Sequence, residues 1–158
     1  MRANLSFSRT PEFISYWVPP ILFGFSILAL SGDWGSAGHT LGLVKWLLSW
    51  LPFLSSDQID LIHGYLRKAA HVLVYGTLYF LWFRAYQGHW RYSLQRAFFW
   101  SLGFCVLVAM LDEGHQALLA SRTGCIADVA LDSAGSTLGA MITLAFWTPR
   151  PPATPPRR

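Results

Sequence analysis

Charged residues are scarce in this chain. Asp, Glu, Lys and Arg make up 13% of its 158 residues, against about 25% in an average soluble domain. Apolar residues reach 53% and aromatic residues 16%, so too few polar side chains remain to cover a soluble globule of this size. The composition excludes intrinsic disorder, argues against an ordinary cytosolic enzyme, and favours a single membrane domain.

Cysteine and the common catalytic signatures are also sparse. The two cysteines cannot form a disulfide scaffold, and Cys105 lies deep inside an apolar run whereas Cys125 lies near the edge of another. The sequence contains no Gly-rich phosphate loop, no nucleophile triad and no CxxC pair. We therefore expect no cofactor.

Four apolar runs approach the roughly 20 helical residues that are needed to cross a bilayer. They cover about residues 13–30, 69–86, 94–111 and 125–147. A fifth run, residues 41–54, is too short to span and is rich in Leu and Trp, which favours a helix lying at the membrane interface. The sequence thus predicts an all-α fold, a polytopic membrane four-helix bundle with a short interfacial helix between spans 1 and 2, in one domain of residues 1–147.

The end of the chain differs from this domain. Residues 148–158 hold five of the nine prolines and three arginines, so we expect a disordered cytoplasmic tail. Four spans would place both termini and the loop around Arg91 on one side, which then collects eight of the twelve basic residues. The positive-inside rule therefore predicts cytoplasmic termini. These arginines suit anionic lipid headgroups better than nucleic acid, so no nucleic-acid partner is expected.

Ionisable side chains interrupt the apolar runs at the opposite face. They open the second span, close the third and open the fourth, as Arg67, Lys68 and His71, then Asp112, Glu113, His115 and Gln116, then Arg122, Asp128 and Asp132. Because a carboxylate exposed to hydrocarbon costs several kcal/mol, we expect the acidic side chains to point into the bundle.

Helical spacing supports this expectation. Arg67, His71 and Tyr75 are four residues apart, which places them on one face of the second span. Asp132 is followed on roughly the same face by Gly135 and Gly139, and such small residues let two helix backbones approach closely. The carboxylate would then lie directly above a tight helix contact.

This ordered set of residues resembles the signature of the VanZ-like family of membrane proteins. The resemblance rests on Lys68-x-x-His71-x-x-x-Tyr75, Asp112-Glu113-x-His115-Gln116, Arg122, Asp128, Asp132, Gly135 and Gly139. The chain departs from the family's usual residues at Leu118, Ala120 and Asp132, where an aromatic residue, proline and asparagine are common. The resemblance implies a small multi-pass protein of the bacterial inner membrane, and the family's prototype is linked to resistance against the glycopeptide antibiotic teicoplanin.

We expect the polar face to bind an amphiphile in the outer half of the membrane, either a membrane lipid or a lipid-linked or lipoglycopeptide ligand. The binding candidates are Arg67, Lys68, Tyr75, Asp112, Gln116, Arg122, Asp128 and Asp132. The cations among them would hold a phosphate or carboxylate head group. If the protein also carries out chemistry, then His71, Glu113 and His115 are the catalytic candidates, since imidazole beside a carboxylate can exchange protons near neutral pH.

Three alternatives stay open. The charged residues could form a structural network that only packs helices, because three fixed cations face four carboxylates. The protein could be an intramembrane enzyme acting on lipid-linked substrates. A proton-coupled transporter ranks last, since the inner halves of the spans have little polar lining. A metal site is not expected, because Glu113-x-His115 lacks the two-His spacing of a zincin and no cysteine joins it.

Overall fold

The computed structural model describes residues 9–32, 35–119 and 125–148. The regular elements of these residues are all helices: α1 (Arg9–Leu30), α2 (Ala37–Leu48), α3 (Ser56–Gly88), α4 (Leu94–Ala117) and α5 (Ile126–Phe146). The all-helical fold expected from the sequence is therefore confirmed.

Serine side chains fix where three of the helices begin. Ser36, Ser55 and Ser93 precede α2, α3 and α4, and each side chain accepts a hydrogen bond from a backbone N–H in the first turn. At Ser55 the bond is reciprocal, because the Gln58 side chain accepts from the Ser55 N–H at 2.9 Å. Such caps satisfy N–H groups that have no partner inside the helix.

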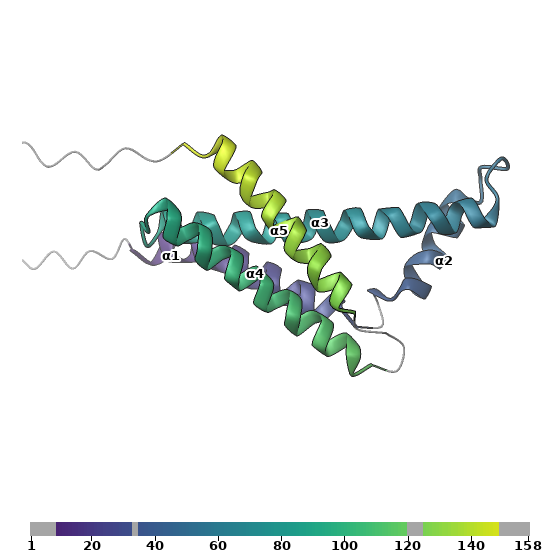
Figure 1. Ribbon diagram of the computed structural model, residues 1–158, viewed down its shortest axis with the longest axis horizontal. Helices are drawn as coiled ribbons and strands as arrows, with labels where there is room; N and C mark the ends of the chain where they lie inside the picture. The colour runs from purple at the N-terminus through teal and green to yellow at the C-terminus, as the bar shows by residue number, and fades with distance from the viewer. Residues whose placement is uncertain (1–8, 33–34, 120–124, 149–158) are drawn as a thin grey trace, which may run out of the picture.

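The long helix α3 organises the fold, since it contacts each of the other four helices. Figure 1 shows α1 and α4 running antiparallel to α3 along its C-terminal half, while α5 crosses α3 and runs in roughly the same chain direction as α3. The N-terminal half of α3 projects beyond this bundle with α2 against it. The first residues of α1, the α3–α4 connection and the last turn of α5 lie at the same end of the molecule (Figure 1).

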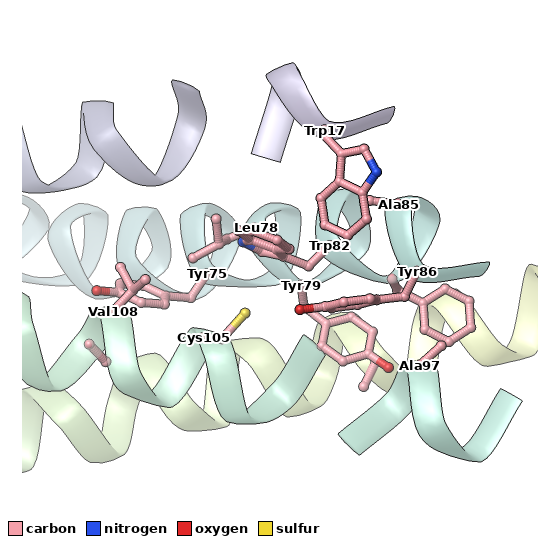
Figure 2. Packing of buried hydrophobic residues seen from close by; sticks show 13 residues of the cluster. Trp17, Tyr75, Leu78, Tyr79, Trp82, Ala85, Tyr86, Ala97, Cys105 and Val108 are labelled. Atoms are coloured by element: carbon pink, nitrogen blue, oxygen red, sulfur yellow. The ribbon is translucent and has the colours of Figure 1, made fainter. Parts of the chain in front are cut away.

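Aromatic side chains of α3 form the centre of the core. Tyr75, Tyr79 and Phe83 are at most 1% exposed, and Figure 2 shows Tyr75 and Tyr79 between α3 and α4, whose Val108 and Cys105 lie beside them. The small side chains of α4 leave room for these rings, which is why the two helices can pack closely.

The outward faces of the bundle are apolar, which is the reverse of a water-soluble protein. Phe25 on α1, Phe99 on α4 and Phe146 on α5 are 72%, 61% and 82% exposed. Contiguous exposed apolar surface of this kind is stable only in contact with lipid or a partner. Three helices of the described residues, α1, α4 and α5, are long and apolar enough to cross a membrane.

The structure extends the expected second span and shifts the expected interfacial helix. α3 begins at Ser56 rather than near residue 69, and its 33 residues correspond to about 50 Å, well beyond a hydrocarbon core of about 30 Å. The crossing of α3 stays a prediction. α2 begins at Ala37 and ends at Leu48, both before the expected 41–54. Of the expected tail, only Thr148 falls within the described residues.

Candidate functional site

Side chains from three helices meet near the end of the bundle at which α4 ends and α5 begins. His71 comes from α3, Asp112 and Glu113 from the last turns of α4, and Asp132 from the second turn of α5. The three acidic residues are 3%, 5% and 0% exposed. One carboxylate oxygen of each lies within 4.8 Å of those of the other two. We call Asp112, Glu113 and Asp132 the carboxylate cluster.

The close crossing of α3 and α5 puts His71 beside Asp132. A Cβ on Gly135 would lie 2.7 Å from the Val72 Cα, and one on Gly139 would lie 2.6 Å from the Gly76 Cα. The backbones therefore touch just below the cluster, as the two glycines predict. One turn above this contact, His71 Nδ1 and Asp132 Oδ1 are 2.8 Å apart.

Each carboxylate of the cluster has one oxygen held by a protein donor. Gln116 Nε2 donates to Asp112 Oδ2 at 3.2 Å, and the Cys125 N–H donates to Glu113 Oε2 at 2.9 Å. His71 takes this role for Asp132 Oδ1. The second oxygen of each carboxylate is buried and has no hydrogen-bond partner among the described residues. The arrangement fixes three side chains and leaves three oxygens available for a further contact.

Arg67 lies one turn before His71 in α3 and points toward the α1–α2 connection and the start of α2. Its Nη1 donates to the Gly35 carbonyl at 3.1 Å and contacts Thr40 Oγ1 at 3.5 Å. Thr40 Oγ1 is also 2.9 Å from His63 Nε2. Burial, and then the charge of Arg67, lower the pKa of His63. A neutral His63 thus helps to dock α2 against α3.

A cavity of about 310 Å³ opens between these groups and α1. We call it the Arg67 pocket, and its lining residues are Phe23, Ser26, Ile27, Leu30, Ser31, Gly35, Thr40, Arg67, Ala70, His71, Val74, Tyr75, Asp112 and Gln116. Polar residues such as Arg67 and Gln116 line the end of the cavity next to α2 and the end of α4. Phe23 and Val74, which lie further along their helices toward the bundle centre, make its inner wall apolar.

The structure gathers most, but not all, of the residues that the sequence singled out. Lys68 and His115 are exposed, on faces of α3 and α4 that turn away from the cluster. Asp128 is half-buried one turn before Asp132. Arg122 lies outside the described residues.

Sequence reasoning missed three polar residues of this region. Ser31 and Thr40 line the Arg67 pocket, and His63 contacts Thr40. A signal existed only for His63, which precedes Arg67 by four residues and so extends the polar stripe of α3 outward by one turn. Ser31 begins the connection between α1 and α2 and Thr40 lies in the first turns of α2, and the apolar runs do not predict the path of this connection.

Comparison with known proteins gives one match. A family model described as VanZ/LLP1 matches residues 16–147 of the chain. None of the curated proteins and none of the solved structures with which the chain was compared matches it.

Proposed function

Because this chain belongs to the VanZ/LLP1 family of membrane proteins, we propose that it binds an amphiphile with an anionic head group in the Arg67 pocket. The protein would cross the bacterial inner membrane several times, with the pocket in the outer half. The observation that carries the proposal is the distribution of polarity along the pocket.

The chemistry of the two ends of the pocket fits the two ends of an amphiphile. Arg67 offers a fixed positive charge and a fork of N–H donors, which suits a phosphate or a carboxylate. Phe23, Ile27 and Val74 offer an apolar wall toward the membrane centre. A cavity of about 310 Å³ accommodates a head group and the first part of a chain, while the rest of the chain would remain in the surrounding lipid.

The test is photo-crosslinking of purified protein in nanodiscs with a photoactivatable phosphatidylglycerol, compared with the corresponding phosphatidylcholine. Crosslinks with the anionic probe should map to the inner wall of the pocket, on α1 between Phe23 and Leu30. Arg67→Gln should lower the yield about tenfold, since a hydrogen bond to a charged group contributes about 1.5–3 kcal/mol.

Lys68→Gln is the matched control. Lys68 is the neighbouring cation, but it is exposed and does not line the pocket. If Lys68→Gln lowers crosslinking as much as Arg67→Gln does, the anionic probe is held by general surface charge and the proposal is wrong. Equal labelling by both lipid probes would also contradict it.

The amphiphile could be a cell-envelope lipid or a lipid-bearing glycopeptide such as teicoplanin. The family supports the second choice, and resistance gives a direct measurement. Expression of the chain in a teicoplanin-sensitive host should raise the inhibitory concentration, and Arg67→Gln should abolish the increase at equal protein level. Unchanged sensitivity, together with crosslinking of the anionic lipid, would identify the lipid as the ligand.

An intramembrane reaction on a lipid-linked substrate is the second candidate. The pair of His71 and Asp132, 2.8 Å apart, favours it, because His71 also lines the pocket and a neighbouring carboxylate can orient an imidazole for proton transfer. Glu113 lies in the same cluster, whereas the exposed His115 would need a substrate that reaches the outer face of α4. Mass spectrometry of envelope lipids from cells with and without the protein should then reveal a new or a missing species.

A further inference from the structure

We propose that the carboxylate cluster binds one divalent cation, held by Asp112, Glu113 and Asp132. This site differs from the Arg67 pocket, although Asp112 borders both, and it does not depend on the amphiphile. The proposal starts from the arrangement of the six carboxylate oxygens. Three of them are oriented by protein donors, and the other three are buried without a hydrogen-bond partner among the described residues.

This division is the one that metal ligands usually show. A ligating side chain is commonly held in place by a hydrogen bond to its non-ligating atom, which fixes its orientation toward the ion. Here one oxygen of each carboxylate accepts a hydrogen bond: Asp112 from Gln116, Glu113 from the Cys125 N–H and Asp132 from His71. The three carboxylates come within 4.8 Å of one another, which is the separation expected of oxygens that share one ion at 2.0–2.6 Å, as the metals preferring oxygen do.

A hydroxyl group supplies an independent observation. Tyr75 is 1% exposed and its hydroxyl has no hydrogen-bond partner among the described residues. Figure 2 shows the ring lying lengthwise between α3 and α4, with the hydroxyl near Val108, and Asp112 follows Val108 by one turn. The hydroxyl nevertheless interacts with Asp112 and with Asp132, toward which it is placed to donate. A buried phenol that lies beside these carboxylates without a close hydrogen bond indicates an occupant that both could contact.

Electrostatics gives the reason for an occupant. Three carboxylates at such short distances repel one another strongly when they are removed from water. One protonated His71 can neutralise one of them. The remaining charge requires bound protons or a cation, and a divalent cation would neutralise two carboxylates at once. The oxygen-rich donor set favours Mg²⁺, Ca²⁺ or Mn²⁺ over the metals that prefer thiolates. Asp112 lines the Arg67 pocket, which provides an access route.

The sequence did not predict a metal site, because Glu113-x-His115 lacks the two-His spacing of a zincin and no cysteine joins it. The ligands proposed here are carboxylates from α4 and α5, and only the packing of the two helices brings them together. His71 holds Asp132 through Nδ1 and is a positioning residue in this proposal.

The experiment measures Mn²⁺ alone on the full-length protein in detergent, with the affinity tag removed and after treatment with a chelator. Electron paramagnetic resonance of free Mn²⁺ should show about one saturable site per chain. Glu113→Gln and Asp132→Asn should each weaken binding at least tenfold, and His71→Gln about 10–100-fold, as expected of a residue that orients a ligand. Asp60→Asn is the control, since its carboxylate pairs with Lys45 at the surface and should leave binding unchanged.

If a variant does not fold, the thermal unfolding of the wild-type protein still tests the proposal. Mn²⁺ should raise the Tm of the wild-type protein by linkage, and the chelator should reverse the increase. In a folded Asp132→Asn variant neither should change the Tm. Stoichiometric binding that survives both cluster variants would move the site elsewhere and overturn the proposal. A wild-type protein without saturable binding or Tm shift would show that protons, not a metal ion, neutralise the cluster.

Discussion

At the scale of single residues, Asp132 depends on one partner. Its side chain is fully buried, and His71 Nδ1 is 2.8 Å from its Oδ1. Removing the imidazole would leave a buried carboxylate without its donor, which typically destabilises a protein by about 3–5 kcal/mol. We therefore expect His71→Ala to lower the free energy of unfolding by about this amount, measured by denaturant titration in detergent with a chelator present.

A double variant controls for loss of packing. In the His71→Ala background, Asp132→Asn removes the stranded charge and should recover most of the lost stability, so that the two effects are strongly non-additive. Additive effects would mean that the pair contributes no more than the packing of two separate side chains.

His63 gives the contact between α2 and α3 a pH dependence. Burial and the charge of Arg67 lower the pKa of His63 below its ordinary value of about 6.5; Asp60 opposes this shift, and Lys45 adds slightly to it. The folded form therefore binds this proton less readily than the unfolded form, so stability is full above about pH 6.5 and falls as the pH decreases toward the lowered pKa.

Hydrogen exchange of the α2 backbone amides measures this effect. Protection, corrected for the intrinsic rate, should decrease between pH 7 and pH 5 as Thr40 loses its neutral partner. The same amides in His63→Gln should show no such decrease. A pH-dependent loss of protection in both proteins would assign the titration to another group.

The candidate site was predictable in its residues but not in every contact. The spacing of the sequence motifs indicated that His71 and the buried acids share one depth, and the structure brings them together. The sequence could not show which of Arg67 and Lys68 faces the pocket. Two adjacent residues of a helix differ by about 100° in direction, and only the position of the docked α2 decides between them. Nor could the sequence predict that Gly35 and Thr40 contact Arg67, since these contacts depend on how the connection before α2 places that helix against α3.

At the scale of helices, the crossing of α3 and α5 sets the position of Asp132. A Cβ on Gly139 would lie 2.6 Å from both the Cα and the carbonyl oxygen of Gly76, and backbone atoms cannot give way as a flexible side chain can. We expect Gly139→Ala to separate the helices and to cost about 1–3 kcal/mol of stability, as overpacking usually does. Denaturant titration measures the loss, and Mn²⁺ binding should weaken with it.

Gly103→Ala is the control for helix propensity. Gly103 lies within α4, and a Cβ there would meet nothing within 4 Å. The substitution should leave stability unchanged or slightly increased, because alanine favours a helix more than glycine does. Equal destabilisation by both variants would contradict the role of the crossing.

Helix boundaries were predictable where apolar runs and helices end together. The fourth run, 125–147, agrees with α5 to within one residue at each end. The second run fails at its start because α3 continues through the polar residues 56–68 back to the Ser55 cap. A search for apolar length does not detect a helix stabilised there by capping and by α2. The partner of Gly135 and Gly139 was also not predictable, since Gly76 carries no signal in its own helix.

At the scale of the whole molecule, the number of crossings determines the orientation of the ends. Three helices of the described residues meet the length and composition of a membrane span, and an odd number would place the termini on opposite sides. The start of α1 and the end of α5 nevertheless lie at the same end of the bundle (Figure 1). This arrangement fits four crossings, with the C-terminal half of α3 as the additional one.

The two native cysteines allow this topology to be measured without a fusion. Cys125 is exposed at the start of α5, and Cys105 is buried inside α4. With cytoplasmic termini, Cys125 lies outside the cell and should react with a membrane-impermeant maleimide in intact cells, whereas Cys125→Ser should abolish labelling.

A reporter after Arg158 tests the other side. A fluorescent protein that folds only in the cytoplasm should be active there, because the basic residues at this end favour the inner face. Maleimide labelling of Cys125 only after the cells are opened, or an inactive reporter on a stably expressed fusion, would invert the orientation. The Arg67 pocket would then face the cytoplasm, and its ligand would have to be sought among lipids of the inner leaflet.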